Sequence, residues 1–160
     1  MMPYRTAVII LSDRAAGGIR PDACIPVVRE VLGPAFDICQ ERILPDDPAA
    51  LQAALIELAD ARTPLVLTSG GTGLSPRDRT PQATAGVLDY EIPGIGEAMR
   101  AESGKFVPTA MLSRAVAGVR DRTLIVNLPG SPKAVRETLA VLLPALPHAL
   151  ELLGGSAVDG

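Results

Sequence analysis

The chain has 160 residues, of which 48% are hydrophobic, and it carries 15 Lys and Arg against 18 Asp and Glu. A chain of this length buries about two-thirds of its surface on folding, so it needs no disulfide or metal scaffold. We therefore expect one domain over residues 1–160. The net charge of −3 and the aromatic content of 2% argue against a nucleic-acid-binding protein, which presents a concentrated positive field or aromatic stacking platforms.

Cysteine usage and the apolar segments indicate where the protein works. Cys24 and Cys39 are too far apart for a CxxC pair, and with one histidine they do not make the usual soft metal site. We expect two reduced thiols in the core rather than a disulfide. The start, MMPYRTAVII, lacks a signal-peptide apolar region, and no apolar run approaches the ~18 residues of a membrane span. We therefore expect a cytoplasmic protein with no membrane partner.

The first half of the chain alternates strand-like and helix-like patterns. Residues 6–11 form a continuous apolar run that predicts a strand buried on both faces. A polar loop over residues 12–21 follows it. Apolar residues at three- and four-residue spacing then predict a helix that begins at Asp22 and stops at Gly33. Residues 36–44 predict a second strand, although polar residues interrupt it.

Three later helices are expected to begin at a capping residue followed by proline. The pairs are Asp47-Pro48, Thr80-Pro81 and Ser131-Pro132. A polar side chain at the cap accepts a hydrogen bond from a free backbone amide, and proline suits the first helical turn. Each of these three helices is expected to begin just after a loop rich in Gly, Pro or Asp.

The order of elements predicts the architecture. Strands that alternate with helices imply right-handed crossovers, so we predict an α/β fold, a three-layer α/β/α sandwich with a mostly parallel sheet. Residues 115–119 and 124–127 predict two strands joined by a tight turn, which adds one antiparallel edge strand. Ligands bind beyond the carboxyl ends of such sheets. The loops that begin at Ser12, Ser69 and Leu128 should therefore share one rim.

The most distinctive segment is TSGGTGLSPRDRTP, residues 68–81. Gly70, Gly71 and Gly73 would let backbone amides converge on an anion without obstruction by side chains. The segment lacks the Lys of a Walker A loop, and Pro76 stands where a GxGxxG fingerprint needs Gly or Ala. A glycine-rich turn with no ligand is the alternative interpretation.

Two carboxylates in or near this segment could take part in binding or catalysis. Asp78 lies between Arg77 and Arg79, a charge cluster that suits an anion or metal site, although an exposed salt bridge also explains it. Asp46 precedes Asp47, which already serves as a helix cap. If the two loops meet at the rim, Asp46 and Asp78 could hold a divalent cation, because hard cations prefer carboxylate and phosphate oxygens.

Two further loops offer binding groups. Residues 127–133, NLPGSPK, turn from a strand into a helix whose free amides could hold a phosphate, and a plain connector explains them equally well. Residues 12–18, SDRAAGG, offer Asp13 and Arg14, or are simply a flexible polar loop. His148, the one histidine, lies among apolar residues, and we expect no catalytic triad around it.

Together, these segments resemble the Mog/MoaB family of molybdenum-cofactor biosynthesis, whose domain also occurs in fusion proteins such as gephyrin. The resemblance runs in order over nearly the whole chain, through SDRAAGG, LPDD, LVLTSGGTGLSPRDRTP, PGIGEAMR, MLSRAVAGV and LIVNLPGSPKAV. It implies a trimer whose substrate is molybdopterin, a pterin with a dithiolene and a terminal phosphate. Members with the Mog activity transfer AMP from ATP to that phosphate with Mg²⁺, and pyrophosphate leaves.

The resemblance also implies roles for individual residues. The two essential acids of the family fall on Asp46 and Asp78, which would be catalytic and would hold Mg²⁺. The other implied contacts are with substrate, and they fall on Ser12, Asp13, Ser69, Gly70, Gly71, Thr72, Gly73, Arg77, Ser113, Pro129, Gly130 and Ser131.

Three positions depart from the family pattern. Asp22-Ala23-Cys24-Ile25 stands where Asp-x-Ser-Gly is frequent, Gln82 replaces an acidic residue, and Arg79 replaces an aliphatic one. We expect a molybdopterin adenylyltransferase, because both acids are present. The alternatives are a molybdopterin-binding MoaB-type paralogue without this activity, and a trimeric interaction module.

Overall fold

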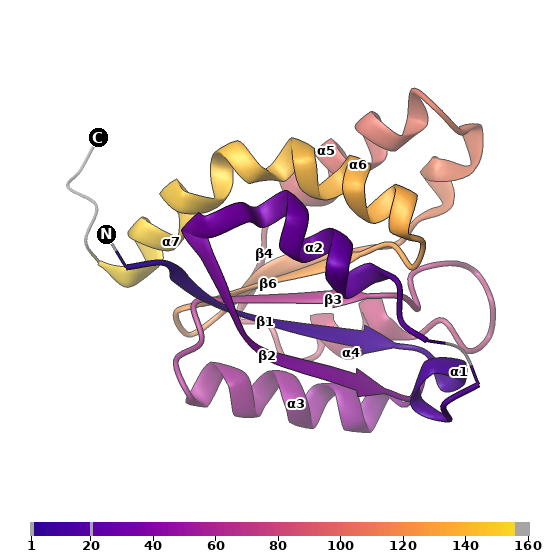
Figure 1. Ribbon diagram of the computed structural model, residues 1–160, viewed down its shortest axis with the longest axis horizontal. Coiled ribbons are helices and arrows are strands. Elements are labelled where there is room, and N and C mark those ends of the chain that lie inside the picture. Colours follow the sequence, from indigo (N-terminus) through magenta and orange to yellow (C-terminus); the bar gives the residue numbers. More distant parts are fainter. Residues whose placement is uncertain (1, 20, 156–160) are drawn as a thin grey trace.

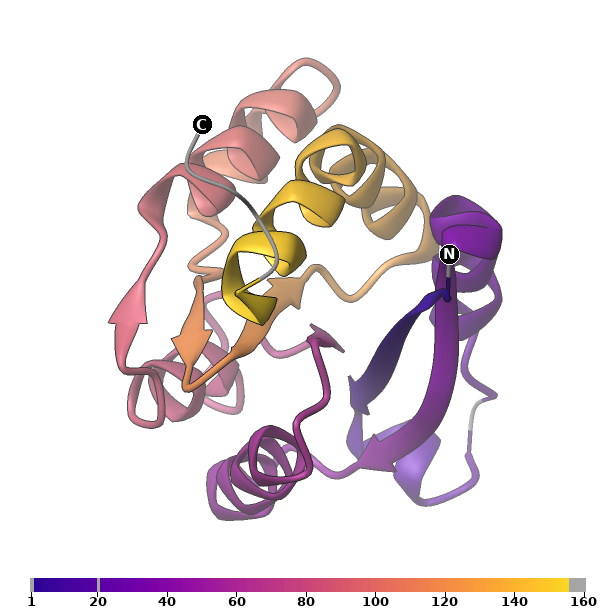
Figure 2. The same cartoon turned by 90° about the vertical axis from the view of Figure 1, so that its left-hand side faces the viewer.

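The computed structural model describes residues 2–19 and 21–155, so Met1, residue 20 and residues 156–160 of the expected domain lie outside it. A six-stranded sheet in the order β2-β1-β3-β6-β5-β4 forms the middle of the molecule (Figures 1 and 2). The strands are β1 (Tyr4–Leu11), β2 (Phe36–Leu44), β3 (Leu65–Ser69), β4 (Tyr90–Glu91), β5 (Ala117–Arg120) and β6 (Thr123–Leu128).

Helices cover both faces of this sheet. The α-helices are α1 (Asp13–Ala16), α2 (Cys24–Leu32), α3 (Pro48–Asp60), α4 (Thr80–Ala85), α5 (Pro93–Gly104), α6 (Pro132–Leu142) and α7 (Leu146–Gly154). Three 3₁₀ turns are η1 (Gly33–Ala35), η2 (Pro108–Leu112) and η3 (Leu143–Ala145). Figure 1 shows α2, α5, α6 and α7 over one face and α3 and α4 under the other. The predicted α/β/α sandwich is confirmed.

The sheet is mostly parallel, as predicted. β1 pairs in parallel with β2 and β3, and β3 pairs in parallel with β6. β5 runs antiparallel to β6, which confirms the antiparallel edge. The short β4 pairs with β5 beyond it and was not predicted, because two exposed residues carry no periodic pattern.

The apolar run of β1 contributes side chains to two hydrophobic cores, one on each face of the sheet, because successive side chains point to opposite faces of a strand. Val8 and Ile10 pack with the buried residues of α2, α6 and α7. Ala7 and Ile9 pack with those of α3 and α4 on the other face. This burial on both faces, with every residue from Thr6 to Leu11 buried, explains the absence of polar alternation in the sequence.

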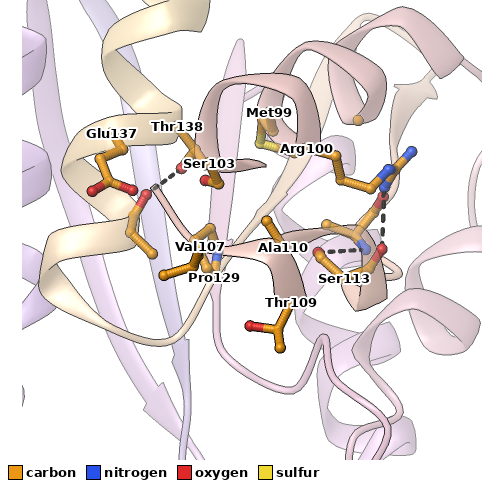
Figure 3. A pocket seen from close by; sticks show the side chains of 13 residues that line it. Met99, Arg100, Ser103, Val107, Thr109, Ala110, Ser113, Pro129, Glu137 and Thr138 are labelled. Carbon is orange, nitrogen blue, oxygen red and sulfur yellow. Dashed lines mark hydrogen bonds between the residues drawn. The ribbon is translucent and has the colours of Figure 1, made fainter. Parts of the chain in front are cut away.

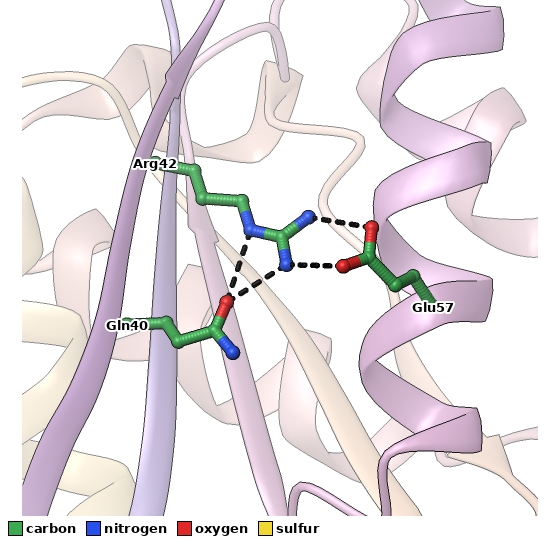
Figure 4. Close-up of polar contacts among 3 residues, drawn as sticks. All are labelled: Gln40, Arg42 and Glu57. Carbon is green, nitrogen blue, oxygen red and sulfur yellow. Dashed lines mark hydrogen bonds and ion pairs between the residues drawn. The ribbon is translucent and has the colours of Figure 1, made fainter.

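An ion-pair network fastens α3 to the edge strand β2 (Figure 4). Arg42 donates to both carboxylate oxygens of Glu57, at 3.1 and 3.0 Å, and to Gln40 Oε1 at 3.2 and 2.7 Å. The hydrogen bonds from Arg42 lower the pKa of the Glu57 carboxyl. The contact joins β2 to α3, the helix that begins just after Asp46 and Asp47.

Helices α6 and α7 and the intervening η3 form one apolar helical run from Pro132 to Gly154, 23 residues long. By length and composition this run could cross a membrane, so the expectation that no apolar segment approaches that length is wrong. Several charged residues in α6 conceal the run in the sequence. In the fold, one side of it packs into the core through Val135, Leu139, Leu142, Leu146 and Leu150.

Two of the three predicted caps are confirmed. Asp47 Oδ1 accepts from the Ala49 amide at 3.0 Å, and Ser131 Oγ accepts from the Ala134 amide at 3.2 Å. Thr80 is not a cap. Helix α4 begins after Arg79, and within residues 2–19 and 21–155 no side chain caps it. Thr80 is instead a buried first helical residue whose hydroxyl packs against the Gly71 backbone.

Two other local expectations are wrong in part. The predicted polar loop after β1 contains the short helix α1, which Ser12 caps by accepting from the Ala15 amide at 3.2 Å. Cys24 is a buried thiol, as predicted, but Cys39 is exposed. Because β2 is an edge strand, alternate side chains point to solvent, and Cys39 has that phase.

A buried polar cluster joins β6 to its neighbours. Asn127, which is 0% exposed, donates through Nδ2 to the hydroxyls of Thr68 at 2.9 Å and Thr84 at 3.0 Å. Its Oδ1 accepts from the Val116 amide at 3.2 Å. Buried polar groups cost stability unless they are hydrogen-bonded. Here both ends of the Asn127 amide have a hydrogen-bond partner. The cluster therefore sets β3, α4 and β6 in register below the rim.

Replacing Asn127 with Ala should lower the free energy of unfolding by about 2–3 kcal/mol, because it leaves buried groups unpaired and opens a void. Urea unfolding followed by circular dichroism measures the change. The matched control is Gln82→Ala, which removes an exposed amide from α4. A loss no larger than that of the control would contradict the structural role of the cluster.

Candidate functional site

The loops that follow β1, β2, β3 and β6 meet at the carboxyl ends of these strands, beside α1 at the right of Figure 1. This is the rim that the sequence predicts. The loops enclose a cavity of about 620 Å³, which we call the rim cavity. Its polar or glycine lining residues are Ser12, Asp22, Asp46, Ser69, Gly70, Gly71, Asp78, Gly130 and Ser131.

Residues 70–73, which we call the glycine loop, pass very close to the ends of β1 and β6. Gly70 and Gly71 have φ angles of +103° and +71°, which residues with a side chain rarely adopt. A Cβ at Gly70 would collide with the carbonyl oxygen of Leu11, and one at Gly71 with the hydroxyl of Thr80. Glycine is therefore required at both positions. The Gly70 amide donates to Leu128 O at 3.2 Å, so it is not free to bind an anion in this conformation.

The acids of the first two loops hold each other. The Asp46 amide donates to Asp13 Oδ1 at 2.9 Å, and the Asp13 amide donates to Asp46 Oδ2 at 3.2 Å. Arg77 forms an ion pair with Asp13, which ties the glycine-loop segment to the end of β1. The pair is well exposed to solvent, so we assign it an orienting rather than a stabilising role.

The fold disfavours the charged form of the Asp46 carboxyl. Burial raises the pKa of its carboxyl, and the nearby charges of Asp13 and Asp78 raise it further, while the Asp13 amide and Arg77 oppose the shift. Negative charge is thus concentrated on one side of the rim cavity. Such a concentration favours a bound cation and is typical of functional sites.

A second cavity of about 140 Å³ lies between α5, η2 and α6 (Figure 3), and we call it the helix cavity. Its volume is close to that of an engineered ~150 Å³ cavity that accepts benzene. Pro129 lines the helix cavity, whereas Gly130 and Ser131 line the rim cavity. The turn between β6 and α6 therefore borders both. Other lining side chains are Met99, Arg100, Ser103, Val107, Ser113, Glu137 and Thr138.

Residues 7–148 match the family model described as "Probable molybdopterin binding domain". The chain belongs to the Mog/MoaB family of molybdenum-cofactor biosynthesis.

Individual relatives agree with this assignment. The chain is 42% identical over 176 residues to the molybdopterin adenylyltransferase of Escherichia coli K12, with 99% of this chain and 90% of that protein covered. In a crystal structure, the molybdopterin biosynthesis enzyme MoaB from Thermus thermophilus shares 48% sequence identity with this chain. The two structures have a TM-score of 0.90, with 95% of this chain and 97% of that one covered. The tungsten cofactor synthesizing protein MoaB of Pyrococcus furiosus is 32% identical, with a TM-score of 0.87 over 96% and 98%.

The structure divides the positions implied by the family resemblance between the two cavities. Most of them line the rim cavity, and Asp13 and Arg77 adjoin it through Asp46 and the Asp13 ion pair. Thr72 is buried, and Gly73 lies so close to Asp78 that a Cβ there would be 2.9 Å from Asp78 Oδ2. Ser113 and Pro129 line the helix cavity instead.

The segment that departs from the family pattern also lines the rim cavity. The Asp22 carboxylate accepts from the amides of Cys24 at 3.0 Å and Ile25 at 2.9 Å, so it caps α2. The Cys24 thiol donates to Gly130 O at 3.4 Å. Arg79 borders a small depression beside Asp46 and Arg77. The sequence pattern places Asp22 at the start of this helix, whereas the Cys24 contact spans 106 residues and has no local signal.

Arg114 was also missed as a site residue. It lies in the family-like segment MLSRAVAGV, and its side chain donates to the carbonyl oxygens of Gly73 and Asp78. These partners are 41 and 36 residues away, so their proximity could not be read from spacing.

Replacing Asp46 with Asn should raise the melting temperature in buffer with chelator at pH 7 by about 1–2 °C, because it removes a half-buried charge that Asp13 and Asp78 repel. Differential scanning calorimetry measures the change, with the exposed Asp60→Asn as control.

The gain should depend on pH. Because folding raises the pKa of Asp46, wild type gains relative stability when this carboxyl is protonated and loses it as pH rises through the folded pKa. The difference between variant and wild type should therefore shrink as pH falls toward about 4. A variant less stable than wild type at pH 7 would show that Asp46 is not under electrostatic strain.

Proposed function

We propose that this protein transfers the adenylyl group of ATP to the terminal phosphate of molybdopterin and releases pyrophosphate. The observation that carries the proposal is the convergence of Asp46 and Asp78, from the loops after β2 and β3, on one rim cavity. The 42% identity to a molybdopterin adenylyltransferase supports the same activity.

The lining of the rim cavity suits this reaction. An oxygen of the molybdopterin phosphate attacks the α-phosphorus of ATP, a new P–O bond forms, and the bond to the β-phosphate breaks as pyrophosphate leaves. The reaction needs no protein nucleophile, since positioning and charge stabilisation supply most of the catalysis of phosphoryl-type transfers. Ser131 begins α6 at the wall of the cavity, and a helix N-terminus favours a phosphate through its free amides and partial positive charge.

The donor set fits Mg²⁺ brought in with ATP. Asp46 and Asp78 provide carboxylate oxygens, and Mg²⁺ is usually held by one or two carboxylates together with substrate phosphates. Burial, and then the charges of Asp13 and Asp78, raise the pKa of Asp46, and a bound cation would oppose this rise. Across residues 2–19 and 21–155, His, Cys, Asp and Glu form no group of three suited to a metal ion. When bound, Mg²⁺ would neutralise charge on the phosphates.

We propose that the helix cavity, of about 140 Å³, takes part of the pterin. Apolar atoms form most of its lining, and polar groups come from Arg100, Ser103, Thr109, Ser113, Glu137 and Thr138. The turn formed by Pro129, Gly130 and Ser131 borders both cavities. We propose that the terminal phosphate of molybdopterin lies at this turn, with the pterin on the side of Ser113.

The assembly and the location are proposals that rest on the family resemblance. We propose a homotrimer that works in the cytoplasm. Large apolar side chains are exposed around η2, including Phe106 at 56% and Met111 at 75%, as expected of a surface that a second copy covers.

A second candidate function is molybdopterin binding without adenylyl transfer. The 48% identity to a protein named MoaB supports it, because the resemblance implies that MoaB-type paralogues include members without the activity. The presence of both Asp46 and Asp78 in the rim cavity favours the enzyme.

Purified protein given molybdopterin, ATP and Mg²⁺ should form the AMP adduct, and Asp78→Asn should slow its formation by about 10²–10³-fold because a charged contact with the reacting phosphates is lost. Chromatography with mass detection follows the adduct. Asp60→Asn, at the far end of α3, is the matched control and should leave the rate unchanged.

Wild-type protein that binds molybdopterin but forms no adduct would contradict the enzyme and support the binding paralogue.

A further inference from the structure

We propose that Arg114 is a positioning residue that holds the acid loop, defined as residues 72–78, and thereby places the Asp78 carboxylate at the rim cavity. The proposal deepens the proposed function, since it concerns how the catalytic acid of that reaction is oriented. Arg114 does not line either cavity. Its effect would therefore be exerted through the loop.

Arg114 contacts both ends of the acid loop. Its backbone amide donates to Thr72 O at 2.9 Å, and its Nε donates to Gly73 O at 2.9 Å. Its Nη2 donates to Asp78 O at 2.5 Å. Hydrogen bonds from a charged donor are stronger than neutral ones. One side chain therefore bridges the residues that open and close the loop.

Both the backbone carbonyl and the carboxylate of Asp78 accept hydrogen bonds. Arg114 binds its backbone carbonyl, and the Ser75 amide donates to its Oδ2 at 3.1 Å. A Cβ at Gly73 would lie 2.9 Å from the same oxygen, so the carboxylate occupies space that a side chain at position 73 would fill. Leu74 through Arg77 are exposed, so packing against the core contributes little to the shape of the loop. The hydrogen bonds from Arg114 and within the loop therefore define it, together with the Arg77–Asp13 ion pair.

The backbone around Arg114 is itself anchored. The carbonyl oxygens of its neighbours Ser113 and Ala115 accept from Arg100 Nη1, at 3.4 and 3.1 Å (Figure 3). Two residues later, Val116 is paired with Asn127 of the buried cluster at 3.0 and 3.2 Å. The segment thus belongs to the wall of the helix cavity, while the Arg114 side chain reaches the acid loop at the rim cavity.

Arginine suits this position better than lysine would. Its planar guanidinium presents donors in a fixed fork, so one side chain can satisfy two carbonyl groups in different directions. A lysine at position 114 would keep the charge and reach one carbonyl at a time. Arg114→Lys therefore separates the geometry of the contact from its charge.

The experiment compares wild type with Arg114→Lys. We expect adduct formation to have a kcat about 10–100-fold lower and a higher Mg²⁺ requirement, as when the supporting residue of a metal-binding carboxylate is lost. The KM for molybdopterin should stay within about twofold, because a supporting-residue change acts on the acid rather than on pterin binding. The matched control is Arg120→Lys, since Arg120 is also half-buried and donates to a backbone carbonyl, Val87 O at 2.9 Å, at the opposite end of the sheet.

Two readouts separate positioning from a general loss of structure. Amide hydrogen exchange should accelerate in residues 72–78 of Arg114→Lys and remain unchanged in β1 and β3. In an Asp78→Asn background, Arg114→Lys should lower kcat by less than about twofold more. The effects of two residues that act through one another are not additive. If Arg114→Lys is too unstable to purify, Arg114→Gln tests the same contact with a neutral planar donor, and the same acceleration of exchange in residues 72–78 is expected.

Unchanged exchange in the acid loop, or an equal loss of kcat in the wild-type and Asp78→Asn backgrounds, would overturn the proposal. Equal effects in Arg120→Lys would overturn it as well, because they would show that any half-buried arginine has this role. An inactive wild type would contradict the proposed function alone, since the exchange comparison still decides whether Arg114 holds the loop.

Discussion

The backbone of Gly70 passes so close to the ends of β1 and β6 that no side chain fits there, and the geometry of the site depends on that contact. Its amide binds Leu128 O at 3.2 Å, and the Ser69 hydroxyl beside it binds Pro129 O at 2.7 Å. A Cβ on Gly130 would lie 3.4 Å from the Gly70 Cα. Three loops are thereby locked together, so both walls of the rim cavity are set by backbone rather than by long side chains.

On this rigid frame the chain places charges that do not favour folding. Burial and the charges of Asp13 and Asp78 raise the pKa of Asp46, which is a cost in the absence of a cation. Arg77 and Arg114 face the same region, through an ion pair with Asp13 and hydrogen bonds to the acid loop. The protein thus accepts an electrostatic cost at the rim cavity, where the proposed reaction would bring together two polyanionic substrates and a cation, and natural proteins commonly accept lower stability at functional sites.

The composition is consistent with this arrangement. A chain with a net charge of −3 has no general attraction for anions, so recognition must be local. Of its basic residues only Lys105 and Lys133 are lysines, and the rest are arginines, whose planar fork suits both phosphate and carbonyl groups. Arg114 uses that fork on carbonyl groups of the protein itself.

Periodic features of the fold could be predicted from the sequence, and contacts between distant segments could not. The run in β1, the caps at Asp47 and Ser131, and the shared rim follow from local pattern and sheet geometry. Thr80 has the residue type of a cap, but its tertiary contact with Gly71 removes it from that role. The site shows the same division. Both acids lie in loops that follow strands, which predicts the rim, whereas the place of Ser113 in the helix cavity could not be predicted, because the path of the chain through η2 has no periodic signal. Arg114 was overlooked because its partners are far away in the sequence.

A crystal structure of the protein with ATP and Mg²⁺ tests the central claim most directly. The account predicts phosphates in the rim cavity between the glycine loop and Asp78, with Mg²⁺ bound to Asp46, Asp78 or both. Nucleotide bound outside this cavity, with both acids turned to solvent, would contradict it.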